Sequence, residues 1–510
     1  MTNSTMTPPP TATAVETAHS TATPDMHSTA TLVSEPTRKR VDTNRSGTPM
    51  PHPRTGRWKA IATGMAQRTL RPRIGTTLAV GAGVLMSLAP GLLPRTPGAQ
   101  AALTGLFVAL TLGVAGLVRF LSARWNVDIN RPLAWLRLPL LGLTLVSIVG
   151  AAAHAGHWQN RLRAVMGTVP IGSDYWLRCA VGAALMVGVF AAIARTAGWV
   201  VGKLGWSRSV AVTAVAASVL YLVGVPAMAD WRRDAYATAN ARIDPTLVQP
   251  VSLLRSGSAE STVSWPSLGA EGRKFVSGSP AGPVRVYVGL DSAPDRDSRV
   301  ALAIRELERS GGFERSNIVV AVPTGSGWID SNAVSGFYQH FGGDVALVGV
   351  QYSYAPSWVS FLFGRDEAVA YARALFTAVE NRIRTMDRKP RLYIYGQSLG
   401  ALGGSSVFTD DADQDRRTCA ALWAGPPAGQ VHRAGATVLA NSSDPVVHWS
   451  PSLLWRAPDL TGVRVDAPVP HWLPVVSFLH TSTDLLAALD APPGHGHRYG
   501  TDQGTALGSC

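Results

Sequence analysis

Charged residues and cysteines are scarce in this 510-residue chain, and each shortage argues against a class of protein or of site. Charged residues make up 15% of the sequence and hydrophobic residues 46%, with a mean hydropathy of +0.11. So little charge beside so much apolar content argues against an ordinary soluble protein and indicates membrane segments. The three cysteines have no spacing with histidine that is typical of zinc. The glycine-rich stretches lack the lysine of a phosphate loop, so we expect neither a metal nor a cofactor.

Positive charge is concentrated in one short stretch. The formal net charge is +13, and residues 38–73 carry ten Lys or Arg residues against one acid, Asp42. The rest of the chain is close to neutral, which argues against nucleic acid as a partner. A basic block before a first apolar run is typical of a cytoplasmic anchor on anionic lipid, although a merely solvated charge run has the same composition.

The N-terminal tail has almost no large apolar residues. Residues 1–56 are rich in Thr, Ser, Pro and Ala and cannot bury enough surface to offset their ordering entropy. The tail does not resemble a signal peptide, because the hydrophobic run starts too late and no small-residue cleavage site follows a short apolar region. We predict a disordered tail with a basic juxtamembrane segment over 1–73.

Five apolar stretches follow the tail, each close to the ~20 residues that cross a ~30 Å hydrocarbon core. They cover 76–94, 101–118, 136–155, 179–200 and 209–229. Their many Gly and Ala residues let helices approach closely in lipid. So many long runs argue against a buried soluble bundle, and we predict an α-helical transmembrane bundle of about five spans over 74–229.

The Arg and Lys residues of the short loops favour a cytoplasmic N-terminus, although the third loop fits the alternation poorly. Five spans then place everything after about Asp230 outside the cytoplasm. Cys419 and Cys510 would both lie there, where they either pair or remain free thiols.

The second half of the chain changes character at residue 283. Residues 230–282 resemble a connector, loop-like and rich in Ser and Gly. We then predict helices over 298–310 and 366–386, and strands over 284–290, 317–323, 344–354, 391–396, 418–427 and 436–446. Strands that alternate with helices are typical of a mostly parallel sheet covered on both faces, which we place at 283–510.

The pentapeptide GQSLG at 396–400 matches the pattern G-x-S-x-G, in which a serine nucleophile sits on a strained turn from strand to helix. The match alone is weak, because chance gives about 0.4 such pentapeptides in a chain this rich in Gly and Ser. Its context is specific, since the strand 391–396 precedes it and LGALGGSSVF follows. We therefore predict that Ser398 is a catalytic nucleophile.

The base that takes the proton from Ser398 should be a histidine in a loop near the C-terminus. The stretch PPGHGHRYG offers both His495 and His497. We favour His497 slightly, but the sequence does not separate the two. His471 and His480 are weaker candidates, because they lie in or beside apolar stretches that resemble core.

An acid should orient that histidine and stabilise its charged form. Asp444 lies just past the apolar residues that open the stretch 436–446, in the second predicted strand after the nucleophile. A plain Asp-Pro turn is the alternative explanation for this residue. Asp459 and Asp484 are the substitutes.

Two backbone N–H groups should stabilise the oxyanion of the reaction. One belongs to Leu399, the residue after the nucleophile. The other comes from the loop TGSGW, near Gly325, if 317–323 is the strand that precedes it. It comes from the region of Leu290 if that strand is 284–290 instead, but the spacing favours Gly325.

Eight stretches, in this order, resemble the bacterial membrane-anchored α/β-hydrolase family, in which a helical membrane domain precedes an α/β-hydrolase catalytic domain. They are LAPGLLPR, RVYVGLDSA, PTGSGWID, VQYSYAPSW, GQSLG, WAGPP, NSSDPVVHWSPSLLW and GHGHRYG. The resemblance covers most of 76–500. It implies a serine hydrolase of esterase or lipase type, whose substrates are poorly defined in the family.

The position beside a bilayer suggests an apolar acyl substrate, such as an ester of a lipid or of an envelope component. Residues 355–364 form either the apolar approach to the site or part of the core. Two alternatives stay open. One is an acyltransferase that moves an acyl group to a lipid or sugar hydroxyl, and the other is a non-catalytic membrane sensor or scaffold with the same fold.

Overall fold

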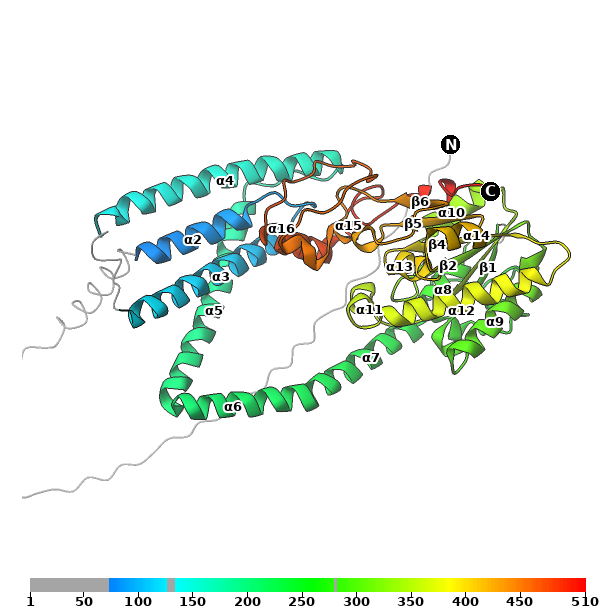
Figure 1. Ribbon diagram of the computed structural model, residues 1–510, viewed down its shortest axis with the longest axis horizontal. Coiled ribbons are helices and arrows are strands. Elements are labelled where there is room, and N and C mark those ends of the chain that lie inside the picture. The colour runs from blue at the N-terminus through cyan, green and yellow to red at the C-terminus, as the bar shows by residue number, and fades with distance from the viewer. Residues whose placement is uncertain (1–72, 126–133, 279–281) are drawn as a thin grey trace, which may run out of the picture. The chain divides into compact units, whose positions relative to one another are not determined.

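The computed structural model of the protein describes residues 73–125, 134–278 and 282–510. Every described residue belongs to one compact unit, 67–510. The predicted disordered tail and nearly all of the basic segment therefore lie outside the described residues. In this unit, long apolar helices come first and an α/β region follows (Figure 1).

Four helices of the first part are long and apolar enough to cross a membrane. Many of their large apolar side chains are exposed, as expected for helices whose surroundings are lipid. A glycine at 205 with φ of 77° separates the third from the fourth. The four are α3 (Pro97–Arg124), α4 (Arg137–Val165), α5 (Tyr175–Leu204) and Trp206–Ala241, which comprises α6 (Trp206–Val219), the π-helical η2 (Leu220–Gly224) and α7 (Val225–Ala241).

The first of the five predicted spans is not among these four, so that prediction needs correction. The stretch 76–94 forms α2 (Ile74–Ser87), a helix of 14 residues, and residues 88–94 are irregular. At 1.5 Å per residue α2 is about 21 Å long, shorter than a ~30 Å hydrocarbon core. α2 packs against α3 and α4, and a Cβ on its Gly83 would lie 2.7 Å from Val108 Cα.

Six parallel strands form one sheet in the order β1-β3-β2-β4-β5-β6. All residues of β2, β3 and β5 are buried, which explains why these strands are continuous apolar runs rather than alternating ones. Each of the six predicted strands is confirmed. Their bounds are β1 (Val284–Val288), β2 (Asn317–Val322), β3 (Val345–Val350), β4 (Arg391–Gln397), β5 (Ala420–Ala424) and β6 (Ala436–Leu439).

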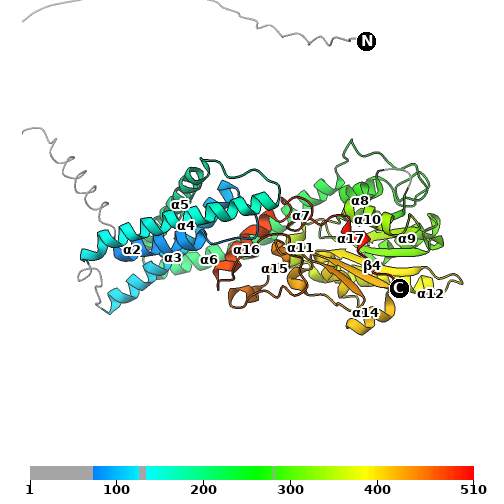
Figure 2. The same ribbon diagram turned by 90° about the horizontal axis from the view of Figure 1, so that it is seen from above.

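Helices cover both faces of the sheet (Figure 2). On one face α9, α12 and α13 pack against one another and the strands. On the other, α8 and α10 contact Tyr287 and Tyr395, which share one row across the sheet. The helices are α8 (Gly269–Val276), α9 (Arg296–Arg309), α10 (Ser331–His340), α11 (Ser357–Phe363), α12 (Arg365–Arg384), α13 (Leu399–Ser405), α14 (Asp411–Arg417), α15 (Pro445–His448), α16 (Val476–Asp484) and α17 (Asp502–Thr505).

Short 3-10 turns complete the described secondary structure. They are η1 (Ala134–Leu136), η3 (Pro266–Leu268), η4 (Leu290–Ser292), η5 (Gly312–Glu314), η6 (Pro427–Gly429), η7 (Pro451–Leu454) and η8 (Leu485–Ala487).

The segment expected to be a connector contributes to the core of the α/β region. Its second half contains α8, which the many Ser and Gly residues around it did not suggest. Leu268, Phe275 and Val276 are buried in the same cluster as the strands. Arg255 also forms an isolated parallel bridge with Arg285 of β1.

A disulfide joins Cys419, just before β5, to Cys510. Of the two possibilities left open by the sequence, the structure therefore contains the pair. Cys179, on α5, is a buried free thiol.

Candidate active site

Ser398 stands on the turn between β4 and α13. Its φ of 55° and ψ of −123° place it among the few residues of the described chain that have positive φ and are not glycine. This conformation is strained for a residue with a Cβ and is the one expected of a nucleophile turn. Side chains on the flanking glycines would not fit. A Cβ on Gly396 would lie 2.3 Å from the Gly400 carbonyl carbon, and one on Gly400 would lie 2.3 Å from the Val322 oxygen.

The loops that follow β2, β4 and β5 converge at Ser398 because these three strands end at the same register of the sheet. Gly396 of β4 lies opposite Val322 of β2 and Trp423 of β5. The loops after these strands therefore open at the same edge of the sheet, where open α/β sheets bind ligands.

His497 and Asp444 form a buried pair at this edge. His497 Nδ1 lies 2.7 Å from Asp444 Oδ2, and the two side chains are 7% and 0% exposed. The carboxylate also accepts hydrogen bonds from the Val446 N–H at 2.8 Å and the Tyr499 hydroxyl at 2.7 Å. Burial, with the Asp444 charge beside it, raises the pKa of Tyr499 well above its usual value, so this hydroxyl stays a neutral donor.

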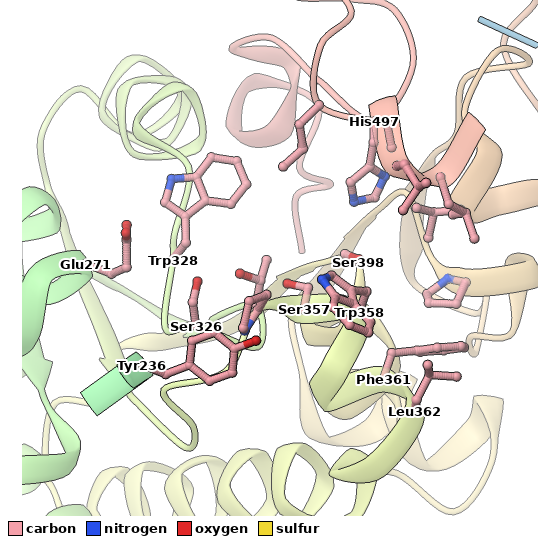
Figure 3. Close-up of a pocket in the computed structure, with 18 of the residues that line it drawn as sticks. Tyr236, Glu271, Ser326, Trp328, Ser357, Trp358, Phe361, Leu362, Ser398 and His497 are labelled. Atoms are coloured by element: carbon pink, nitrogen blue, oxygen red, sulfur yellow. The ribbon is translucent and has the colours of Figure 1, made fainter. Parts of the chain in front are cut away.

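Ser398 and His497 line the same cavity (Figure 3). Because Nδ1 faces Asp444, Nε2 is the imidazole nitrogen left to accept a proton from a nucleophile. No hydrogen bond within 3.5 Å joins these two described side chains in this conformation. In sites without substrate this contact is often long, and it tightens when substrate binds.

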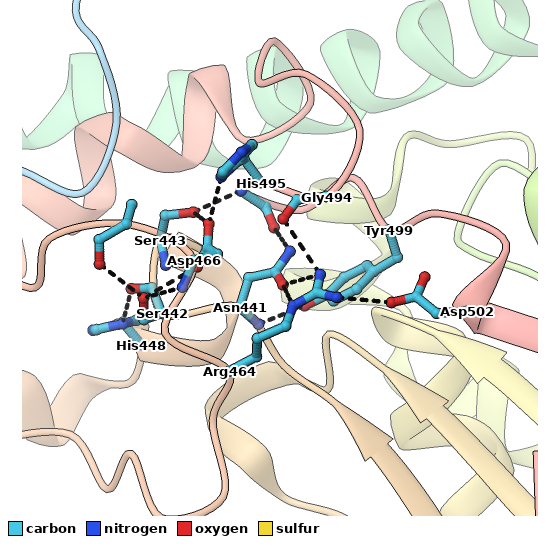
Figure 4. A network of polar contacts seen from close by, with 12 residues as sticks. Asn441, Ser442, Ser443, His448, Arg464, Asp466, Gly494, His495, Tyr499 and Asp502 are labelled. Carbon is cyan, nitrogen blue, oxygen red and sulfur yellow. Dashed lines mark hydrogen bonds and ion pairs between the residues drawn. The ribbon is translucent and has the colours of Figure 1, made fainter. Parts of the chain in front are cut away.

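His495, the other predicted candidate, has a different partner. Its Nδ1 lies 3.0 Å from Asp466 Oδ2, and it does not line the cavity (Figure 4). Asp466 also accepts hydrogen bonds from the hydroxyls of Ser442 and Ser443. The Ser443 hydroxyl in turn accepts from the Gly496 N–H at 2.7 Å. This second pair therefore braces the loop that carries both histidines.

The weaker candidates lie elsewhere. Asp459 lies in a turn closed by its own carboxylate, and Asp484 is paired with Arg95. His471 is exposed. His480 is buried against a backbone carbonyl of α2, and desolvation lowers its pKa to about 3.

The two predicted oxyanion donors differ in availability. Leu399 opens α13 directly after Ser398, so its N–H is among the free donors of a helix start. The Gly325 N–H donates to Ser357 Oγ at 3.1 Å, so it serves an oxyanion only after this bond breaks. β2 neighbours β4 as expected for this loop, and its Thr324 and Ser326 line the cavity. The alternative near Leu290 follows β1, which β3 and β2 separate from β4.

The cavity beside Ser398 has a volume of about 780 Å³. Most of its walls are apolar, and the stretch 355–364 contributes to them as α11. In Figure 3, Phe361 and Leu362 lie on one side of Ser398, and Tyr236 and Glu271 on the other. The apolar lining comes mainly from Trp328, Trp358, Phe361, Leu362, Trp449, Leu485, Leu486 and Leu489.

Polar groups gather at the end away from α11. Glu271 Oε1 is paired with Lys274, while its Oε2 is buried without a hydrogen-bond partner among the described residues. Tyr236 and Asn240 reach this end from α7, which continues the last apolar helix. The cavity therefore has an apolar end, a polar end, and Ser398 between them.

Two residues of the site escaped sequence reasoning. Gly425 has φ of 54°, and a Cβ there would lie 2.7 Å from His497 Cε1 and 2.9 Å from Asp444 Oδ2. Its signal was a glycine directly after a buried strand, in WAGPP. Tyr499, the hydroxyl donor to Asp444, has no such signal, since only the fold brings it there.

Two family models match most of the chain. A model described as the alpha/beta-hydrolase family matches residues 284–437 and 430–508. A second, described as the N-terminus of an alpha/beta-hydrolase family, matches residues 88–280. No curated protein and no solved structure gives a match.

Proposed function

Because this chain belongs to the alpha/beta-hydrolase family of these two models, we propose that it is a membrane-anchored serine esterase. One observation carries the proposal. Ser398 sits on a strained turn in a cavity that it shares with His497, and His497 is held by the buried carboxylate of Asp444. A scaffold without catalysis would not need this strain, whereas a nucleophile turn does.

In the proposed reaction, Ser398 Oγ attacks the ester carbonyl while His497 Nε2 takes its proton. Asp444 holds the imidazole through Nδ1 and stabilises its charged form, and Tyr499 and Val446 hold Asp444. The Leu399 N–H, with a second donor from the loop at Gly325, stabilises the tetrahedral oxyanion. The protonated histidine then gives its proton to the leaving alcohol, and water releases the acyl group by the same steps.

The cavity supports an amphiphilic ester as the substrate. An acyl chain suits the aromatic and leucine side chains around α11 and η8. A polar alcohol group suits the opposite end, where the free oxygen of Glu271 accepts hydrogen bonds from hydroxyls. The wall supplied by α7 favours a source in the bilayer, because that helix is continuous with the last candidate span.

The arrangement of charges supports an extracytoplasmic α/β domain. At one end of the helices, the Arg119 guanidinium of α3 donates to the Thr76 hydroxyl of α2, three residues after Arg73, the last residue of the basic segment in the sequence. The opposite end holds Arg95, which joins the helices to the α/β region through Asp484. Residues 74–95 run from the first end to the second, so the start of α2 and the α/β region lie at opposite ends although α2 itself is shorter than a hydrocarbon core. The positive-inside rule then favours a cytoplasmic tail and an extracytoplasmic α/β region. The Cys419–Cys510 disulfide agrees, because disulfides persist in oxidising compartments.

The test of the catalytic proposal is fluorophosphonate labelling of the full-length protein in lipid nanodiscs. The wild type is expected to be labelled at Ser398, and Ser398→Ala to lose the label completely, since the hydroxyl forms the covalent bond. Ser482→Ala is the matched control, because Ser482 lines the same cavity from α16, outside the turn and the loop assigned to catalysis, and should leave labelling intact. Equal labelling of wild type and Ser398→Ala would remove the proposal.

A further inference from the structure

A buried ion pair joins the membrane helices to the α/β region. Arg95 Nε lies 2.9 Å from Asp484 Oδ1 and Arg95 Nη2 lies 3.1 Å from Oδ2, with the side chains 3% and 1% exposed. The Leu92 N–H donates to the same carboxylate at 2.9 Å. Such a bidentate contact fixes orientation as well as distance.

The arginine is itself held by two of the membrane helices. Its backbone N–H donates to Gln159 Oε1 at 2.8 Å on α4. Its carbonyl accepts from Arg163 Nη2 at 2.7 Å and from the Tyr175 hydroxyl at 3.2 Å, on α4 and α5. The position of Arg95 is therefore set by the helix bundle rather than by the α/β region.

The aspartate lies a few residues away from the catalytic loop. Asp484 ends α16, the turn η8 follows, and the carbonyl of Ala488 accepts the backbone N–H of His497 at 3.0 Å. Leu485 and Leu489 from this same segment line the cavity. A shift of Asp484 would thus move both the backbone of His497 and the cavity wall.

A second contact joins the same two parts. A Cβ on Gly496, next to His497, would lie 3.3 Å from Leu93 Cδ2. Leu93 is buried in a small cluster with Leu162 of α4 and Ala491 of the histidine loop. The loop therefore touches the irregular segment 88–96 both through packing and through Asp484.

We propose that Arg95 and Asp484 are positioning residues, through which the membrane bundle holds His497 in register with Ser398. The inference rests on the proposed function for its catalytic consequence, but the coupling itself is structural. It gives the bundle a task beyond anchoring, because the imidazole is in place only when α2 through α5 are assembled. Misplacement of a catalytic group by about 1 Å costs about 100-fold in rate.

The test uses the full-length protein in nanodiscs and two measurements. Hydrogen–deuterium exchange of peptides covering 488–499 reports the His497 loop without reference to activity, and fluorophosphonate labelling reports the reaction of Ser398. The variants are Arg95→Leu, Arg95→Lys and the milder Asp484→Asn, which preserves shape if Arg95→Leu fails to fold. Glu380→Gln is the matched control, since it breaks the Arg417–Glu380 pair between α12 and the end of α14.

We expect Arg95→Leu and Asp484→Asn to speed exchange in 488–499 at least tenfold and to slow labelling by about 100-fold. Arg95→Lys should show smaller changes in exchange and in labelling than Arg95→Leu, because it keeps the positive charge. Glu380→Gln should change neither the exchange of 488–499 nor the labelling rate. Unchanged exchange in a folded Arg95→Leu or Asp484→Asn protein would overturn the coupling. If exchange responds but even the wild type is not labelled, the coupling stands and the proposed function fails.

Discussion

Two histidines that lie two residues apart in one loop, His495 and His497, each contact an aspartate, and the two histidine–aspartate pairs have different surroundings. His497–Asp444 is almost fully buried, is joined at 2.7 Å and lines the cavity with Ser398. His495–Asp466 is joined at 3.0 Å, has a histidine side chain that is 20% exposed, and does not line the cavity. The residue types are therefore the same in both pairs, and the path of the backbone distinguishes a candidate base from a brace.

The largest expected effect comes from replacing each of these two histidines in turn and comparing the losses of activity. His497→Ala should lower the fluorophosphonate labelling rate and esterase turnover by about 10⁴-fold or more, because no other imidazole of the described residues lines the cavity. His495→Ala should lower them by less than about tenfold, since it loses one partly exposed hydrogen bond. Comparable losses in both variants would show that the two pairs are not functionally different.

A glycine substitution breaks the first pair without touching either member. Gly425→Ala should reduce labelling by about 100-fold or more, because its Cβ would lie 2.7 Å from the His497 ring and displace it. Gly429→Ala is the matched control, since Gly429 also has positive φ but its nearest atom would be 3.6 Å away on Arg433. Both variants place an alanine at positive φ, so a loss of labelling per folded molecule in Gly425→Ala alone would report the clash with His497 rather than backbone strain.

A smaller effect is expected from Tyr499→Phe, which tests how much the Tyr499 hydroxyl contributes to holding Asp444 beside His497. The loss of a hydrogen bond to a buried carboxylate should cost about 1.5–3 kcal/mol, or about 10- to 100-fold in turnover if it falls on the reaction. Tyr395→Phe is the control, since its buried hydroxyl donates to Gln503 at 2.7 Å. It should lower thermal stability without lowering turnover per folded molecule.

The smallest effect on activity, no change, is expected at His480, a buried histidine with no carboxylate partner among the described residues. Its Nε2 contacts the Met86 carbonyl, its Nδ1 is buried with no hydrogen-bond partner in the described part of the chain, and desolvation lowers its pKa to about 3. As the pH falls through about 6.5, His480 therefore binds a proton in the unfolded chain but stays neutral in the folded chain. Lowering the pH below about 6.5 should therefore destabilise the protein, by at most about 1.4 kcal/mol per pH unit from this group, and His480→Gln should flatten that slope in thermal unfolding.

Much of the α/β architecture could be read from the sequence, because continuous apolar strands and amphipathic helices follow from burial on both faces of a parallel sheet. The strained position of Ser398 was predictable from its two glycines, which no side chain could replace. The choice between His495 and His497 was not, since it depends on the turns at Gly494 and Gly496, with φ of 92° and 54°. Tyr499 and Arg95 were missed because their partners lie 55 and 389 residues away.

The number of membrane helices shows a different failure of sequence reasoning. Hydropathy marks the stretch 76–94 as a span, yet the helix ends at Ser87 and the remaining residues turn toward α16, where Leu92 contacts Asp484. An apolar window does not distinguish residues that face lipid from residues that pack on a neighbouring domain. Here the second kind of contact shortened the helix.

The length of the helix Trp206–Ala241 has a further consequence. Its 36 residues extend about 54 Å, of which a hydrocarbon core takes about 30 Å, so about 24 Å stand beyond the lipid tails. Tyr236 and Asn240 form cavity wall near its far end. In the proposed orientation this helix sets the height of Ser398 above the membrane, and each residue added within it would raise that height by about 1.5 Å and rotate the cavity wall by about 100°.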